Sequence, residues 1–226
     1  MVRKVSPRRI VEDGRTWRNS MVGEIRIYVE GGGDSKDTKA FFRQGFSAFL
    51  HALRSEARRR KVRWSIIACG PRQRAFEDFK IAGREHPTAF NVLLVDSESP
   101  VLSPPWQHLG ERDGWDIRGL SNDRCHLMVQ AMEAWFIADI ETLSQYYGQG
   151  FNANPIPASQ NVENTGKEVL NRSLKEATRN TSKGEYHKGR HAYKLLELID
   201  PIIVRHASQH CDRLFVTIAE KMQEEI

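Results

Sequence analysis

The chain has 226 residues, 39% of them hydrophobic, and a formal net charge of +5 at pH 7. These values fit one domain, or one domain with an extension, around a substantial core, and they require no second large domain. The three cysteines, Cys69, Cys125 and Cys211, are widely spaced and form no paired motif, which argues against a disulfide framework and favours the reducing cytoplasm.

Residues 1–22 are basic and polar and lack the apolar centre of a signal peptide, so we expect a flexible basic arm. Nothing elsewhere approaches the roughly 20 apolar residues that a membrane span needs. We therefore expect a soluble protein with no membrane partner.

Three short runs rich in Val, Ile and aromatic residues follow, and they lack polar alternation: IRIYV (25–29), WSIIACG (64–70) and FNVLLV (90–95). Such runs are typical of buried strands in a parallel sheet. The segments between them, 37–61 and 72–86, carry apolar residues at helical spacing and are long enough for crossover helices. This order predicts an α/β fold of the Rossmann-like, doubly wound type with a mainly parallel sheet.

The second half is expected to be rich in helices. Residues 97–119 contain many Pro, Gly and Trp residues and predict a long irregular loop, in which Trp106 and Trp115 anchor the loop or stack on bases. Residues 122–140 are apolar nearly all round and predict a buried helix. The expected parts are a basic arm at 1–22, an α/β domain at 23–120 and a helix-rich C-terminal extension at 121–226.

Carboxylates follow two of the predicted strands. Glu30 comes directly after the first strand and precedes three glycines, and Asp96 and Glu98 come after the third. Neither the G-x-x-x-x-G-K-[ST] nor the G-x-G-x-x-G phosphate pattern is present. If the two strands are neighbours, all three carboxylates meet at the carboxyl edge, where open α/β sheets bind ligands.

Carboxylates that meet in this way repel one another. At a separation of 4 Å the repulsion is roughly 4 kcal/mol for an effective dielectric of 20, so a cation usually holds such a cluster. Oxygen ligands favour Mg²⁺ or Mn²⁺. Two alternatives stay open: Glu30 is a solvated strand end, and Asp34 or Asp37 caps the next helix.

The motifs YVEGGGD and VDSE resemble the Toprim family, the catalytic fold of topoisomerases, bacterial primases, recombination-mediator proteins and OLD-family nucleases. That family has a glutamate, often followed by glycine, after its first strand and D-x-D after its third; here Glu98 replaces the second aspartate. The resemblance covers about residues 24–120. It implies that Asp96 and Glu98 bind metal, that Glu30 binds metal or acts as acid or base, and that Asp34 assists catalysis.

Two residues of the second half are candidates for the same site. The predicted helix at 122–140 carries a polar stripe made of Asn122, His126, Gln130 and Glu133. The stripe is either an internal hydrogen-bond network or partner salt bridge, or it makes Glu133 an additional metal ligand or an orienting residue, which the resemblance to OLD-like nucleases favours. Lys188, near the start of a later helix, is either an ordinary exposed residue or a cation that neutralises a phosphoryl transition state.

A cluster of cations lies between the first and second predicted strands. It consists of Arg54, Arg58, Arg59, Arg60, Lys61 and Arg63, with only Glu56 nearby. Such a block suits the phosphate backbone of nucleic acid, and it equally suits a solvated helix end whose cations complement the helix dipole.

Together with the carboxylate cluster, the resemblance to the Toprim family implies a Mg²⁺-dependent nuclease that acts on DNA or RNA, or a related phosphoryl-transfer enzyme. The chain also looks like the small stand-alone Toprim-like proteins of bacteria that accompany an ATPase of the SMC or ABC type, sometimes in phage defence, so that resemblance implies an ATPase partner. The alternatives are a non-catalytic binding subunit with a vestigial site, docked on such an ATPase, and a small-molecule phosphohydrolase.

Overall fold

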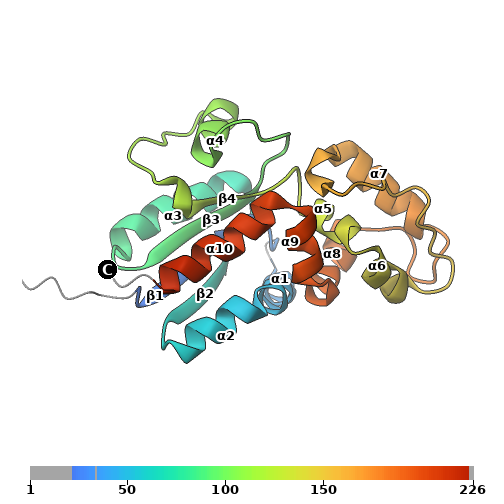
Figure 1. Cartoon of the computed structure of the whole chain (residues 1–226), viewed down its shortest axis with the longest axis horizontal. Coiled ribbons are helices and arrows are strands. Elements are labelled where there is room, and N and C mark those ends of the chain that lie inside the picture. The colour runs from blue at the N-terminus through green and yellow to red at the C-terminus, as the bar shows by residue number, and fades with distance from the viewer. Residues whose placement is uncertain (1–21, 34, 224–226) are drawn as a thin grey trace, which may run out of the picture.

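The computed structural model describes residues 22–33 and 35–223. Within them a parallel sheet of four strands has the order β2-β1-β3-β4 (Figure 1). The strands are β1 (Glu24–Val29), β2 (Arg63–Ala68), β3 (Phe90–Asp96) and β4 (Cys125–Met128). The predicted α/β class with a doubly wound parallel sheet and a helical C-terminal part is confirmed, and the first and third strands are neighbours as expected.

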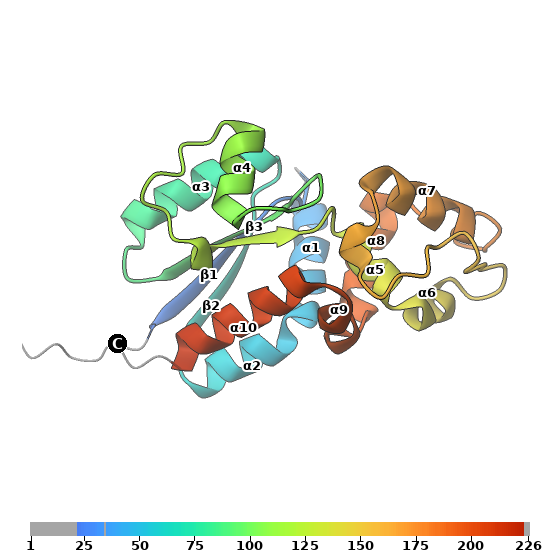
Figure 2. The same ribbon diagram turned by 45° about the horizontal axis from the view of Figure 1, so that its top comes forward.

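Helices cover both faces of the sheet (Figures 1 and 2). One face carries α1 (Lys36–Phe49) and α2 (His51–Arg59), and the other carries α3 (Arg72–Glu85) and α4 (Pro105–Asp113). The helix predicted over 37–61 is therefore two helices, which meet at Leu50. The prediction of one long irregular loop over 97–119 was wrong, because α4 forms in the middle of this segment. Pro105 suits the first turn of α4, and Gly114 ends the helix in a left-handed conformation.

The two faces of the sheet have separate cores. On the first face, Phe42, Phe46 and Phe49 of α1 pack on the sheet at helical spacing. On the other face Trp115 stacks on Phe76 with ring centroids 4.2 Å apart, and Trp106 packs on the same cluster. Both tryptophans are buried, so the alternative in which they stack on bases was wrong.

The helix predicted over 122–140 was also wrong. The segment forms a 3-10 turn, η1 (Asn122–Arg124), then strand β4, a turn and the short helix α5 (Glu133–Ala138). A run that is buried on every side has no period, so its residues suit a central strand as well as a buried helix. The polar stripe therefore does not exist as one face, and the sheet continues past residue 120, the predicted domain boundary.

The remaining helices extend the molecule beyond the carboxyl ends of the strands, except that α10 returns beside β4 and α2 (Figures 1 and 2). They are α6 (Ile140–Tyr147), the 3-10 turn η2 (Val162–Asn164), α7 (Lys167–Thr178), α8 (Lys188–Leu198), α9 (Pro201–Ala207) and α10 (Gln209–Gln223). Helix α8 packs closely on α1, since a Cβ on Gly45 would lie 2.5 Å from the Tyr193 carbonyl oxygen.

A buried carboxylate fixes the start of α10. Glu163 Oε1 accepts hydrogen bonds from Ser208 Oγ at 2.6 Å and from the His210 backbone N–H at 2.8 Å, and Oε2 lies 2.9 Å from His210 Nδ1. Burial favours the protonated acid, but the hydrogen bonds from His210 and Ser208 outweigh it and lower the pKa of Glu163. The ionised form therefore stabilises the fold.

We expect Glu163→Gln to lower the free energy of unfolding by about 1–3 kcal/mol at neutral pH, the usual cost of breaking buried hydrogen bonds to a charged group. Because the folded-state pKa is depressed, this contribution is complete above the ordinary pKa of 4.5 and is lost as the pH falls through the folded-state value. Urea unfolding of both proteins from neutral to acidic pH measures it. The exposed Glu168→Gln serves as control, and an equal loss at all pH values would contradict the account.

Candidate metal centre

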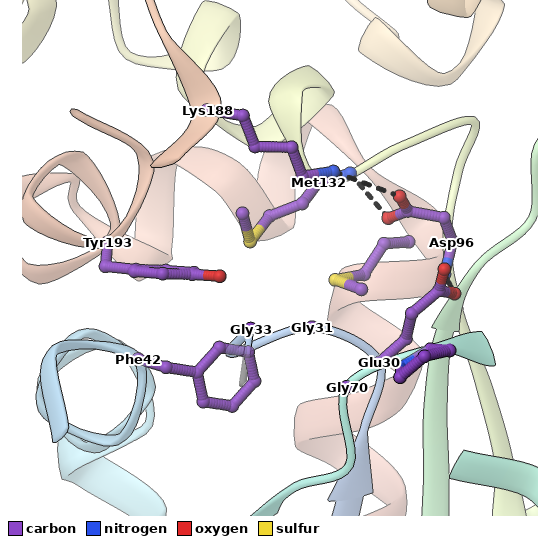
Figure 3. A pocket seen from close by; sticks show the side chains of 11 residues that line it. Glu30, Gly31, Gly33, Phe42, Gly70, Asp96, Met132, Lys188 and Tyr193 are labelled. Carbon is purple, nitrogen blue, oxygen red and sulfur yellow. Dashed lines mark hydrogen bonds and ion pairs between the residues drawn. The ribbon is translucent and has the colours of Figure 1, made fainter. Parts of the chain in front are cut away.

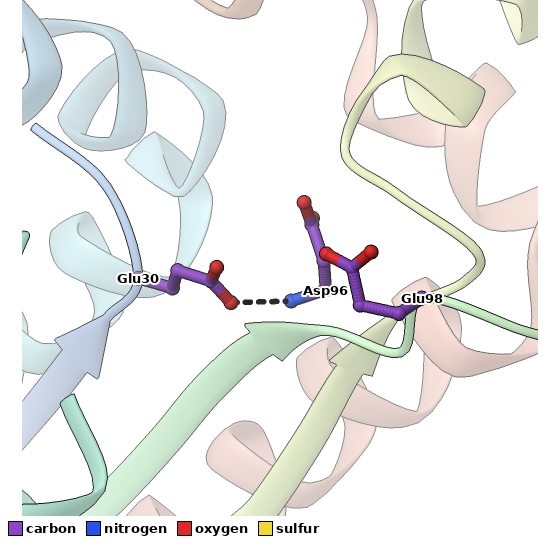
Figure 4. Close-up of side chains that lie close together, drawn as sticks. All are labelled: Glu30, Asp96 and Glu98. Atoms are coloured by element: carbon purple, nitrogen blue, oxygen red, sulfur yellow. Dashed lines mark hydrogen bonds between the residues drawn. The ribbon is translucent and has the colours of Figure 1, made fainter. Parts of the chain in front are cut away.

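Three carboxylates converge at the carboxyl edge of the sheet (Figure 4). Glu30 directly follows β1, Asp96 ends β3 and Glu98 lies two residues further on. One oxygen from each lies within 4.8 Å of the other two. The strand order thus brings these side chains together as predicted, although Glu98 arrives through a left-handed backbone with φ of 66° and not through continued strand geometry.

A glycine turn places Glu30. Gly31 and Gly70 exchange two backbone hydrogen bonds of 2.8 Å, which tie the ends of β1 and β2 together. Gly32 has φ of 95°, and a Cβ on it would lie 2.7 Å from Ala68 Cβ. Its N–H donates to Tyr193 Oη at 3.0 Å. Only glycine fits this close approach, so the turn fixes the direction in which Glu30 leaves the sheet.

The residue that caps α1 is neither Asp34 nor Asp37 but Ser35. Ser35 caps α1, and its hydroxyl accepts a hydrogen bond from the Thr38 N–H at 3.0 Å. Asp34, predicted to assist catalysis, lies outside the described residues, and Asp37 falls within the first turn of α1.

Asp96 is the most buried member of the cluster. Its Oδ1 accepts the Met132 N–H at 2.9 Å, and Oδ2 lies 3.5 Å from Lys188 Nζ (Figure 3). Burial raises the pKa of Asp96 to about 7, with help from Glu133 and Glu30 and against the opposing effect of Lys188. The ionised form is therefore costly, and a further cation would stabilise it.

Glu133 and Lys188 lie beside this cluster. Glu133 falls outside the group of three converging oxygens; its Oε1 accepts the Tyr186 hydroxyl at 2.9 Å, and its buried Oε2 has no hydrogen bond but lies 3.5 Å from Lys188 Nζ. Burial lowers the pKa of Lys188, but Asp96 and Glu133 outweigh it and raise the pKa above its ordinary value. Lys188 thus stays protonated between two carboxylates.

Two cations that the sequence analysis missed complete the surroundings. Arg72, the first residue of α3, lies 3.2 Å from Glu30 Oε2 and 2.8 Å from Asp113 Oδ2, and it donates to the Asp96 carbonyl. Its position just after β2 was a usable signal, because β2 ends at the same edge. Lys167 Nζ lies 2.5 Å from Glu98 Oε1, and no local pattern predicts this contact across 69 residues.

The basic block does not lie with the cluster. Arg63 begins β2 and pairs with Glu24, the first residue of β1, whereas the carboxylates lie at or just after the last residues of β1 and β3. At about 3.3 Å per residue the strand separates them by roughly 20 Å. Arg59 and Arg60 also pair with Glu56 within the block. The predicted nucleic-acid surface is thus at the opposite end of the sheet.

A pocket of about 280 Å³ opens beside the carboxylates. Figure 3 shows Glu30, Asp96 and Lys188 along one side of it and the rings of Phe42 and Tyr193 along the other. The pocket therefore offers both charged and apolar surface to a ligand.

A family model described as "Domain of unknown function (DUF4276)" matches residues 29–219. The chain belongs to this family. No curated protein and no solved structure matches it. The stretch that matches the DUF4276 family includes the strand-end carboxylates and Lys188, so both halves of the site lie within one family unit.

We expect Gly32→Ala to destabilise the protein by roughly 1–3 kcal/mol through backbone strain alone, and the contact with Ala68 adds to this cost. Gly83→Ala is the matched control, because Gly83 lies within α3 and a Cβ there meets nothing within 4 Å. That change should stabilise the helix by about 0.5–1 kcal/mol. Urea midpoints measure both, and equal effects would show that the turn does not require glycine.

Proposed function

We propose that the protein is a Toprim-like nuclease that depends on Mg²⁺ or Mn²⁺ and hydrolyses phosphodiester bonds in DNA or RNA. The observation that supports this proposal is the convergence of three carboxylate oxygens within 4.8 Å of one another, beside a protonated lysine and an open pocket. Acidic clusters of this kind at the carboxyl edge of a parallel sheet suit ligand binding.

The residues present fit a hard divalent cation. The donor set is made only of carboxylate oxygens, and Asp96 is buried at the cost of its ionised form. Glu30, Asp96 and Glu98 would hold the ion, and Glu133 would orient the site through Lys188. When bound, such an ion supplies Lewis-acid stabilisation of phosphoryl oxygens and lowers the pKa of water.

The other side chains act around that ion. Lys188 offers an ammonium group at the wall of the pocket, where it balances the charge of a substrate phosphate. Glu30 is less buried than Asp96, and its alternative role to metal binding is to accept or return a proton on the attacking or leaving oxygen, with Asp34 as its assistant. Arg72 holds the Glu30 carboxylate and the Asp96 carbonyl in place.

The basic block at 54–63 then acts away from the chemistry. Because it lies at the opposite end of the sheet, it contacts only a substrate long enough to reach from one end to the other. Its contacts would go to phosphates, so they would weaken with salt and carry little sequence information.

The setting of the activity is also a proposal. We assign it to the cytoplasm, where the buried free thiols of Cys69, Cys125 and Cys211 stay reduced, and to partnership with an ATPase of the SMC or ABC type in phage defence. Among residues 22–33 and 35–223 no helix has the length and apolar character that a membrane crossing needs.

A non-catalytic binding subunit is the second candidate, and one observation favours it. Each carboxylate of the cluster already has a cation at close range: Arg72 on Glu30, Lys188 on Asp96 and Lys167 on Glu98. A vestigial site held together by its own lysines and arginine needs no metal, and such a subunit would act by docking on the ATPase.

We expect the purified protein to cleave single-stranded or duplex DNA or RNA in Mg²⁺ or Mn²⁺ but not in EDTA. The variant with Glu30→Gln and Asp96→Asn should lose more than about 100-fold in rate, since changes one shell further from a metal already cost 10- to 100-fold. Gel assays of labelled substrates measure this. Glu77→Gln, an exposed carboxylate on α3, should cleave normally, and activity that survives in the double variant would contradict the proposal.

Lys167→Ala separates the two candidates by metal binding alone. If a divalent ion must displace the ammonium from Glu98, calorimetry should show Mn²⁺ binding that tightens by up to about fivefold in the variant, the worth of a partly exposed ion pair. Lys175→Ala on the same helix, whose partner Glu185 is exposed, should bind like the wild type. Absence of Mn²⁺ binding in all three proteins would favour the vestigial site.

A further inference from the structure

A second pocket, of about 540 Å³, lies next to the pocket beside the carboxylates, which we call the metal pocket. Side chains of α1, α6 and α8 line it, among them Phe41, Tyr146 and Tyr193. Tyr193 lines both pockets: its ring packs on Phe42 at a centroid distance of 5.3 Å, and its hydroxyl accepts the Gly32 N–H. The two pockets thus share one lining residue, which is itself fixed to the glycine turn.

The charges of the second pocket balance. Arg190 and Lys194 contribute two cations, and Asp37 and Glu197 contribute two anions, one of which pairs with Lys194 at 3.0 Å. A pocket with no excess of positive charge does not suit a phosphate, because each phosphate carries a full negative charge. It does suit a neutral group with donors and acceptors on its edge, for which Gln44 and Thr38 also offer partners.

Phe41 gives this pocket an unusual wall. This residue is 62% exposed, whereas the neighbouring Phe42 is buried in the core. None of the ring pairs found within residues 22–33 and 35–223 includes Phe41. The fold therefore does not need an aromatic residue at position 41, and an open ring face is available to a planar ligand.

We propose that the second pocket binds an unpaired nucleobase of the strand whose phosphate lies at the metal centre. The inference rests on the proposed nuclease function and specifies its substrate as single-stranded, or unpaired at this nucleotide. A base has a flat face for Phe41 and a polar edge for Gln44, Arg190 and the carboxylates, while its sugar and phosphate pass over Tyr193 to the metal pocket. A base within a duplex has that edge already occupied by its partner.

Binding tests this without any requirement for cleavage. The probe is a fluorescent single-stranded oligothymidylate in EDTA, followed by anisotropy, with the matching duplex as comparison. Phe41→Ala should weaken binding of the single strand by about 5- to 150-fold, the fold-change that corresponds to the measured worth of one base stacked on an aromatic ring. Phe41→Trp, which keeps an aromatic ring at this position, should bind the single strand as the wild type does. Ile202→Ala on α9 is the matched control, because Ile202 is 61% exposed and lines neither pocket.

Cleavage adds a second readout. An abasic site moved along the strand should slow wild-type cleavage at one position relative to the cut, and Phe41→Ala should add no further loss on that substrate, because both changes remove the same contact. Equal binding of Phe41→Ala and Ile202→Ala, or equal affinity of the wild type for duplex and single strand, would overturn the inference. If either result were found while the wild type still cleaved in a metal-dependent way, the proposed nuclease function would stand without the base pocket. Absence of metal binding and cleavage in the wild type would refute the nuclease function itself.

Discussion

The site depends on the burial of Asp96 among other carboxylates. Its pKa is raised to about 7 because it lies away from water and near Glu133 and Glu30, so the ionised form requires cations close by. Lys188 provides one, and it reaches Asp96 only because α8 packs closely on α1. Gly45 permits that approach, since any side chain there would meet the α8 backbone at 2.5 Å. The ion pair that offsets the buried charge of Asp96 therefore links the edge of the sheet to α8, a helix far along the chain.

The helical second half is part of the site and more than an extension of the α/β domain. Lys188 and Tyr193 of α8 line the pocket beside the carboxylates, and Lys167 of α7 pairs with Glu98. A boundary drawn at residue 120 would separate these groups from Glu30 and Asp96, and it would also cut off β4 from its own sheet. The match to one DUF4276 family over residues 29–219 agrees with a site built from both halves.

The sequence predicted what local patterns determine. Short β-branched runs gave the three strands, and the rule that parallel strands end at one edge placed Glu30, Asp96 and Glu98 together. The prediction from sequence failed over 122–140, because a segment that is buried on all sides lacks the hydrophobic periodicity that distinguishes a strand from a helix. It also missed Lys167 and the exposed Phe41, because their partners and surroundings are set by packing between distant segments. The role of the basic block stays a prediction, and its distance from the carboxylates could not be predicted from the charges alone, because it depends on which end of β2 the block adjoins.

The most direct test of the account is the position of a bound ion. Crystals grown with Mn²⁺ and measured at its absorption edge would show an anomalous peak wherever the ion is held. We predict a peak among Glu30, Asp96 and Glu98, with Lys167 moved away from Glu98. Crystals that show no peak at this edge of the sheet, with Lys167 still paired with Glu98, would contradict the assignment of a metal centre.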